Sequence, residues 1–314
     1  MIDLQDLHAL PKFRDGLSYL YLEHGWIDQD AKSIAFHSKS EKTPVPVASL
    51  CMLMLGPGTS ISHAAIRTLA DNNCLVVWCG EENVRFYASG MGGTRSAAPL
   101  LRQAALASDE VSRLGVARRM YAMRFEEEID PGLSIEQLRG MEGVRVRDAY
   151  ARQSQETGIE WHGRSYDRGD WRSADPVNRA LSAANSCLYG LCHAAILSCG
   201  YSPAIGFIHT GKQLSFVYDV ADLYKTEVTV PVAFAAARDA TEDLERAVRL
   251  RCRDMFRQTK LLRRIVPDIQ KALGEPEAED LLAELFANDP AMPAPLWTPE
   301  SERGEGTGPE VTPQ

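Results

Sequence analysis

Short apolar runs separated by turn residues fill the chain from residue 17 to residue 90. They are rich in valine, leucine, tyrosine and phenylalanine and are bounded by glycine, proline or asparagine, as β-strands are. The runs are LSYLYLEHG (17–25), SIAFHS (33–38), VASLCMLML (47–55), CLVVWCG (74–80) and VRFYASG (84–90). One helical segment, SISHAAIRTLADN, interrupts them and starts with serines that can cap it. Because helices do not alternate with the strands, we expect an antiparallel β-domain with one helix.

After residue 96 the apolar positions recur every three or four residues, which is the period of a helix. The segments with this period are 98–128, 134–158, 176–200, 214–225 and 240–266. They predict an all-α second domain. The polar and aromatic segment between them, EWHGRSYDRGDWRSADP (160–176), is typical of a loop. Beyond Gly274 the chain is rich in proline and glutamate, which indicates a largely disordered tail.

The length of 314 residues exceeds the usual size of one domain, so we expect an α+β multi-domain protein. Its parts are residues 1–95 (β-domain), 96–275 (α-helical domain) and 276–314 (acidic tail). The net charge of −9 resides in that tail, because ten acids and one base follow Gly274. The rest of the chain is neutral overall, with 33 acids and 33 bases. The total charge therefore does not exclude a nucleic-acid partner.

The sequence contains no uninterrupted apolar run of about 18 residues, and its acidic start MIDLQDLHAL does not resemble a signal sequence. We therefore expect a cytoplasmic protein without a membrane segment. The seven cysteines include no CxxC pair, which indicates reduced thiols. The spacing of Cys187, Cys192 and His193 fits no familiar zinc site, and cysteine in such an alanine-rich helix is normally core filler.

The segment GFIHTGKQLSFVYDVADLYK (206–225) carries His209, Asp219 and Asp222. Its second half is typical of a largely buried helix, on which the two aspartates share one face. Two carboxylates this close repel each other and burial disfavours both charges, so they need a proton, a hydrogen-bonded cation or a metal ion. Two interpretations stay open at this point: a divalent-metal site, or a solvated edge on which His209 caps or packs.

Glu142 is a further acid in an unusual setting, since Gly140 and Gly143 flank it within a helical pattern. Each glycine costs roughly 1 kcal/mol relative to alanine in a helix, so we expect close approach of a neighbouring element there. Glu142, His209, Asp219 and Asp222 together would supply carboxylate oxygens and one imidazole. That set suits Mg²⁺ or Mn²⁺ better than a thiolate-binding metal, and it points to phosphoryl transfer.

These motifs resemble those of the CRISPR-associated protein 1 family, the integrase of CRISPR adaptation, in its type I-E branch. The motifs are LRGMEG around Glu142, GFIHTGK around His209 and SFVYDVADLYK around Asp219 and Asp222, with PGTSISHAAIR, VRFYASG, RSYDRGDW and SCLYG in support. The resemblance covers about residues 10 to 275. Several long matches in the same order make it more specific than one short motif.

The resemblance implies an N-terminal β-sandwich for dimerisation and DNA contact, followed by a C-terminal helical catalytic domain. It further implies a homodimer of unequal roles, two of which bridge a central dimer of CRISPR-associated protein 2. In such complexes the 3′-hydroxyl of a captured foreign DNA fragment, the prespacer, attacks a phosphodiester at the leader end of the CRISPR repeat. Carried over by position, Glu142, His209 and Asp222 match the family's metal ligands. Asp219 matches a nearby acid that supports the site.

Basic residues at helical spacing form a second candidate feature. They are Arg246, Arg249, Arg253, Arg257, Lys260 and Arg264. We expect them to line one face of a helix, either as a phosphate-tracking stripe or as an ordinary solvated face. The resemblance favours DNA contact for Arg246 and Arg249. It also implies DNA contact for Arg85, and a place near the DNA 3′ end for Tyr166 and Tyr189.

Lys212 follows His209 by three residues and could neutralise the attacked phosphate or lie on the surface as an ordinary lysine. His24 is a departure from the family pattern. Type I-E relatives carry a tyrosine there, before the glycine of the first hairpin, which stacks on the end of the DNA duplex. An imidazole stacks with less area and adds a titratable charge, so we expect weaker splaying of duplex ends.

The leading hypothesis is a metal-dependent DNA integrase that inserts prespacers into the CRISPR array with Mg²⁺ or Mn²⁺. One alternative is a stand-alone, structure-specific DNA endonuclease, because hydrolysis needs only water in place of the 3′-hydroxyl. Another is a non-catalytic DNA-holding subunit, in which the carboxylate cluster is present but is used only by some copies in the assembly. The sequence does not separate transfer from hydrolysis, since both use the same ligands.

Overall fold

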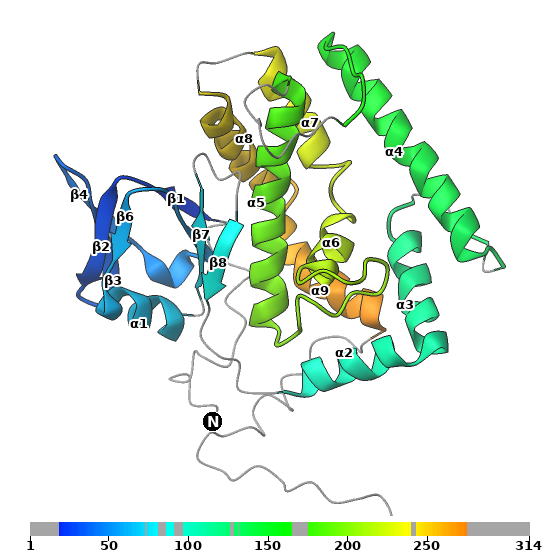
Figure 1. The fold of residues 1–314 in the computed structure, drawn as a ribbon, viewed down its shortest axis with the longest axis horizontal. Coiled ribbons are helices and arrows are strands. Elements are labelled where there is room, and N and C mark those ends of the chain that lie inside the picture. The colour runs from blue at the N-terminus through cyan, green and yellow to red at the C-terminus, as the bar shows by residue number, and fades with distance from the viewer. Residues whose placement is uncertain are drawn as a thin grey trace, which may run out of the picture.

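The computed structural model describes residues 19–72, 74–80, 86–90, 97–125, 129–130, 132–164, 175–239 and 243–274. A strand-rich part lies beside a helical part (Figure 1), and all described strands precede residue 91. The predicted division of fold classes along the chain is therefore confirmed. Arg85, Tyr166 and the predicted tail (276–314) lie outside the described residues.

The described strands form two four-stranded sheets. The first has the order β1 (Leu20–Leu22), β5 (Met52–Leu55), β7 (Leu75–Cys79) and β8 (Phe86–Gly90). The second has the order β4 (Lys42–Val45), β3 (Ser33–His37), β2 (Gly25–Asp30) and β6 (Thr59–Ile61). A short 3₁₀ turn (Val47–Ser49) precedes β5, and the predicted helix is α1 (His63–Asp71). Ser62 caps α1 by accepting a hydrogen bond from the Ala65 N–H.

The expectation of purely antiparallel strands is wrong. The pairs β1–β5, β5–β7 and β2–β6 are parallel, whereas β2–β3, β3–β4 and β7–β8 are antiparallel. The parallel pairs arise because the chain leaves the first sheet after β1, builds the second sheet, and returns at β5. It leaves again through β6 and α1 before β7, and such crossovers are what parallel neighbours require. The apolar pattern within each strand carries no information on this path.

The central strand β5 of the first sheet is buried on both faces. Alternate residues of β5 point to opposite sides: Leu53 and Leu55 join the core shared with the second sheet and α1, while Met52 and Met54 join the core of the helical part. Helix α5 (Pro176–Ser198) approaches this face closely at Gly190, where a Cβ would lie 2.6 Å from the Met52 sulfur. The helical part thus rests on the outer face of the first sheet.

The helical part surrounds α5, as Figure 1 shows. Its other helices are α2 (Ala98–Ser108), α3 (Glu110–Ala122), α4 (Ile135–Thr157), α6 (Ser215–Ala221), α7 (Thr229–Arg238), α8 (Leu244–Gln258) and α9 (Leu261–Leu273). Within the described residues, α5 alone is long and apolar enough to cross a membrane, and 67% of its most apolar window is buried inside the protein. Its apolar character is that of a core helix.

The basic segment 240–266 does not form the single predicted helix. It contains α8 and α9, which are separated at Thr259 and Lys260, and Lys260 has a left-handed φ of 51°. Arg249 is only 9% exposed, and its guanidinium lies 4.3 Å from the centre of the Tyr21 ring. The expectation that the six basic residues line one face of a single helix is therefore wrong, because α8 ends at Gln258 and because Arg249 packs against the first sheet.

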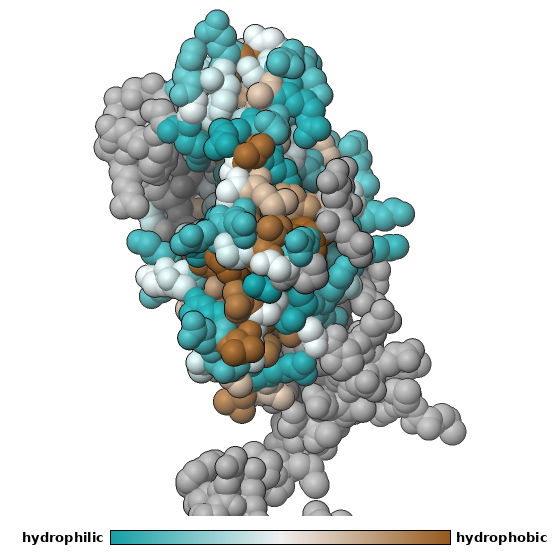
Figure 2. Space-filling model, turned by 90° about the vertical axis from the view of Figure 1, so that its right-hand side faces the viewer, coloured by the Kyte–Doolittle hydropathy of each residue, from teal (hydrophilic) through white to brown (hydrophobic). Residues whose placement is uncertain are grey.

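A band of apolar side chains is exposed on the side of the molecule that carries α2 to α4 (Figure 2). The exposed residues on these helices are Leu100, Leu101, Val111, Leu114, Met141 and Val144. The expected close packing at the α4 glycines is not found among the described residues: none of them lies within 4 Å of a Cβ built at Gly140, and the nearest atom at Gly143 belongs to the Arg147 side chain. Exposed apolar surface of this kind is typical of contacts with other molecules.

Candidate functional site

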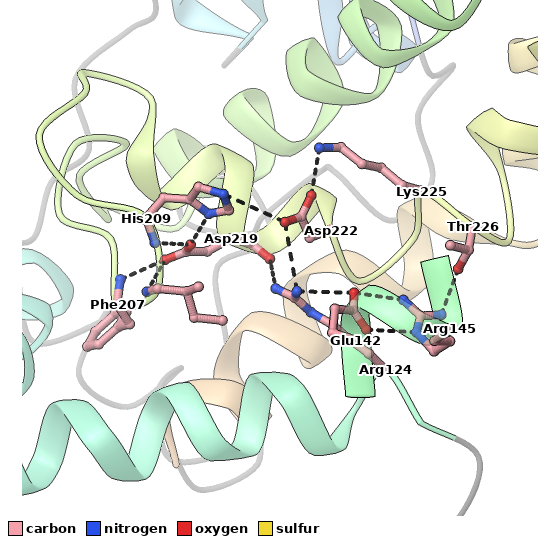
Figure 3. A network of polar contacts seen from close by, with 10 residues as sticks. Arg124, Glu142, Arg145, Phe207, His209, Asp219, Asp222, Lys225 and Thr226 are labelled. Atoms are coloured by element: carbon pink, nitrogen blue, oxygen red, sulfur yellow. Dashed lines mark hydrogen bonds and ion pairs between the residues drawn. The ribbon is translucent and has the colours of Figure 1, made fainter. Parts of the chain in front are cut away.

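Asp219 is the buried anchor of the predicted cluster. Its side chain has 0% exposure and comes from the middle of α6. One carboxyl oxygen accepts the N–H groups of Phe207 (2.6 Å) and Ile208 (3.1 Å), and the other accepts the N–H of His209 (2.8 Å), as Figure 3 shows. Gly206 permits this tight loop, because a Cβ there would lie 2.3 Å from the His209 carbonyl oxygen. The loop before α6 is therefore tied to α6 by backbone hydrogen bonds.

The same carboxylate orients the His209 ring. His209 Nδ1 lies 2.7 Å from Asp219 Oδ1, whereas Nε2 faces the other way and lies 3.9 Å from Asp222 Oδ2. Because the Asp219 oxygens are used as acceptors, Nδ1 is the donor in this pair, and Nε2 faces Asp222. A carboxylate behind a histidine in this way is the usual support of a metal-binding imidazole. Asp219 thus positions His209 and has no oxygen left for a ligand.

Glu142 reaches the cluster from a different element. It lies on α4, which Ser134 and Gln137 start with a reciprocal capping box. Arg145, one turn further along α4, grips the Glu142 carboxylate at two points, with Nε at 2.8 Å from Oε2 and Nη2 at 3.0 Å from Oε1. Arg145 also donates to the Thr226 hydroxyl at 2.8 Å, which links α4 to the segment after α6.

Arg124 joins the two halves of the cluster. Its side chain is 3% exposed, and Nη1 lies 3.4 Å from Glu142 Oε1 and 3.8 Å from Asp222 Oδ2. Nη2 donates to the Asp219 carbonyl oxygen at 3.4 Å. One guanidinium nitrogen therefore lies between two carboxylates that would otherwise repel each other. The sequence indicates that these acids need a proton, a cation or a metal ion nearby. In this structure Arg124 is that cation.

Lys225 and two tyrosines complete the surroundings. Lys225 Nζ lies 2.6 Å from Asp222 Oδ1 and 4.9 Å from the centre of the Tyr189 ring. Burial lowers the pKa of the Lys225 ammonium, but the charge of Asp222 and the Tyr189 contact outweigh it and raise the pKa above its ordinary value. Tyr218 packs edge-on against both Tyr189 and His209. The result is a charged lysine beside an aromatic wall.

Residues 19–130 and 121–243 match the model of the family described as CRISPR associated protein Cas1. The chain belongs to this family. It is 54% identical over 301 residues to CRISPR-associated endonuclease Cas1 2 of Thermus thermophilus, which covers 95% of the chain and 91% of that relative. The crystal structure of TtCas1 is 52% identical, has a TM-score of 0.76 and covers 82% of this chain and 98% of its own. A TtCas1–DNA complex is 56% identical, with a TM-score of 0.63 and coverage of 84% and 99%.

Membership of the Cas1 family confirms the resemblance that the motifs predict. The relatives that carry an endonuclease name support nuclease chemistry for the family. The strand-rich start and helical remainder of this chain also match the Cas1 structures.

The donors of the cluster fit a divalent ion in kind, although no three His, Cys, Asp or Glu side chains in the described part of the chain are grouped as a ready metal site. The arginines explain this arrangement. Arg145 holds Glu142 at both oxygens, and Arg124 lies between Glu142 and Asp222. Two carboxylates and an imidazole nitrogen aimed at one of them remain a donor set of the type that Mg²⁺ and Mn²⁺ accept.

The predicted DNA-contact residues have different positions. Tyr189 contacts the cluster through Lys225. Lys212 is exposed, and its backbone is hydrogen-bonded with the Ser215 hydroxyl at the start of α6. Arg246 is exposed in the first turn of α8. Arg249 is buried against Tyr21.

His24 is exposed and has a left-handed φ of 55° in the turn between β1 and β2. These two strands belong to different sheets, so the expected hairpin is in fact a connection between the sheets. The His24 N–H donates to the Pro57 carbonyl oxygen at 3.1 Å, which fixes the turn beside the β5–β6 connection.

The sequence reasoning missed Arg124, Arg145, Tyr218 and Lys225. Helical spacing could have indicated two of them, since Arg145 follows Glu142 by three residues and Lys225 follows Asp222 by three. Arg124 comes from the end of another helical segment, and no spacing rule connects it to the acids.

Proposed function

We propose that this Cas1-family chain is a metal-dependent DNA integrase of CRISPR adaptation, which inserts prespacers into the CRISPR array. The observation that carries the proposal is that Glu142 of α4 and Asp222 at the end of α6 lie on either side of one guanidinium, with His209 Nε2 3.9 Å from Asp222 Oδ2. In this proposal the three residues hold Mg²⁺ or Mn²⁺. When bound, the ion would polarise the attacked phosphodiester and stabilise charge on its oxygens.

The remaining residues of the site have distinct tasks in this proposal. Asp219 positions His209 through the Nδ1 contact, so that Nε2 faces Asp222 for the ligand role. Lys225 stays charged and attracts the DNA phosphate, while Tyr189 and Tyr218 offer ring faces and hydroxyls to the nucleotide at the 3′ end. Lys212 and Arg246 are exposed cations for further phosphates, and Arg85 and Tyr166 retain their proposed DNA contacts.

The proposed partners follow the family resemblance. They are the prespacer duplex with 3′ ends, the leader-repeat DNA, a CRISPR-associated protein 2 dimer, and a second copy of this chain, with two such dimers in a complex. The DNA complex of a relative that is 56% identical supports the DNA partner. We place the activity in the cytoplasm, where the CRISPR array would be.

A stand-alone DNA endonuclease is the second candidate, and the endonuclease names of the relatives favour it. The decisive assay supplies a short duplex with free 3′-hydroxyls, a supercoiled plasmid with a leader and repeat, the small partner protein and Mn²⁺. Joined product supports the integrase, whereas nicked plasmid without joining supports the endonuclease. If Glu142→Ala joined or nicked DNA as efficiently as wild type, the proposed site would not be the active site of either reaction.

A further inference from the structure

Arg145 holds both oxygens of the proposed ligand Glu142. The contacts at 2.8 and 3.0 Å form a bidentate pair. The third guanidinium nitrogen, Nη1, donates to the Thr226 hydroxyl at 2.8 Å. The planar guanidinium fork fits a carboxylate in this way better than a lysine would. Glu142 therefore has a strong internal partner in the arrangement that the structure describes.

Arg145 and Arg124 differ in their freedom to move. Arg124 is 3% exposed and packs over the Tyr121 ring, and its Nη atoms contact Glu142 and the Asp219 carbonyl oxygen. Arg145 is 25% exposed, and its guanidinium lies between Glu142, Thr226 and the Phe125 ring near the surface. Releasing Arg124 would leave a buried charge, whereas Arg145 can turn toward solvent. Arg145 is thus the one of these two arginines that can exchange partners.

We propose that Arg145 competes with the divalent ion for Glu142 and releases Glu142 when a DNA phosphate offers its guanidinium another partner. This inference rests on the proposed function, because it requires Glu142 to be a metal ligand. A metal ion held by Glu142 would share the carboxylate oxygens to which Arg145 donates, and two cations on one carboxylate repel each other. A phosphate forms the same bidentate pair with arginine as a carboxylate does.

The consequence is a coupling between metal and DNA binding. DNA increases the metal affinity of the site by drawing Arg145 away, and the metal increases DNA affinity by the same factor. Arg145 is a positioning residue in this scheme, since it acts on the ion through Glu142. The metal-free site also keeps its acids paired, which limits metal uptake before DNA is bound.

The test is a calorimetric titration of the full chain with Mn²⁺, with and without a short duplex ending in 3′-dideoxynucleotides, which lack the attacking hydroxyl. Arg145→Ala should bind Mn²⁺ about tenfold more tightly than wild type without DNA, because removing a nearby cation relieves repulsion. Duplex should tighten Mn²⁺ binding to wild type by a similar factor and to Arg145→Ala by less than about twofold. The Mn²⁺ affinity of Thr226→Val without DNA should lie between those of wild type and Arg145→Ala.

Arg147→Ala is the matched control, because Arg147 is an exposed arginine on the same helix. It should bind Mn²⁺ as wild type does. Equal or weaker Mn²⁺ binding by Arg145→Ala, or a full duplex effect in that variant, would overturn the inference. Glu142→Ala separates the two proposals: if it binds Mn²⁺ like wild type, the metal site itself fails, whereas loss of binding there with no change in Arg145→Ala refutes only the competition.

Discussion

The two halves of the candidate site are held in different ways. On the α6 side, three backbone N–H groups and an imidazole converge on the buried Asp219, so His209 is fixed by the same hydrogen bonds that close the loop. On the α4 side, Glu142 is held by the side chains of Arg145 and Arg124. The first half is part of the folded core, and the second depends on ion pairs that another cation can replace.

This difference implies a division of labour. Backbone hydrogen bonds of buried groups are costly to break, so the α6 half should be present whether or not metal is bound. Ion pairs between side chains can rearrange at lower cost when a stronger cation arrives. We therefore expect metal and DNA binding to rearrange the ion pairs of the α4 half and to leave the hydrogen bonds of the α6 half unchanged.

The largest expected effect separates the two acids by their contribution to folding. Asp219→Ala leaves the N–H groups of Phe207, Ile208 and His209 without their acceptor and should lower the free energy of unfolding by about 3 to 5 kcal/mol. Glu142→Gln keeps the side-chain size and should lower it by about 1 kcal/mol, because Arg124 retains its Asp222 and Asp219 contacts. Urea unfolding of both variants checks this. Equal losses would contradict the comparison.

The next effect concerns the cation between the halves. Arg124→Gln removes the charge between Glu142 and Asp222 and should lower stability by about 2 to 3 kcal/mol without metal, since two carboxylates then face each other. Mn²⁺ should recover more stability in this variant than in wild type, because the ion replaces the lost charge. Thermal unfolding in EDTA and in Mn²⁺ measures both. An identical Mn²⁺ shift in Arg124→Gln and wild type would show that Arg124 does not face the ion.

A pair of glycine substitutions sharpens the comparison further. Gly206→Ala should cost about 2 kcal/mol and weaken Mn²⁺ binding, because the new Cβ would meet the His209 carbonyl oxygen and displace the loop. Gly140→Ala should instead stabilise the protein by about 0.5 to 1 kcal/mol, since nothing lies within 4 Å of its Cβ and alanine is the better helix former. Chemical unfolding together with Mn²⁺ titration distinguishes them. A gain in stability from Gly206→Ala would show that the loop is not tightly determined.

Much of this arrangement could be predicted from the sequence. The apolar period of segment 214–225 predicted a buried helix that carries Asp219 and Asp222; α6 confirms this for Asp219, whereas the helix ends at Ala221 and Asp222 is its C-terminal cap. The change from short runs to helical period also located the two parts of the fold. Both results rest on local periodicity, which each segment carries by itself.

Local periodicity could not predict the contacts between segments that are distant in the sequence. The strand directions depend on where the chain crosses between sheets, and neighbouring residues do not record that path. The separation of α8 from α9 occurs at Thr259 and Lys260, without a proline or glycine to mark it. Arg124 reaches the acids from the end of α3, so its role depends on tertiary packing alone.

The central claim is that Glu142, His209 and Asp222 bind one divalent ion together. Electron paramagnetic resonance of Mn²⁺ titrated into the full chain, with the prespacer duplex present, tests it most directly. Glu142→Gln, His209→Gln and Asp222→Asn should each lower the affinity for the same Mn²⁺ ion by about tenfold or more, since each variant removes one of few protein ligands. Glu136→Gln, an exposed acid in the first turn of α4, should leave it unchanged. Wild-type Mn²⁺ affinity in any of the three ligand variants would contradict the account.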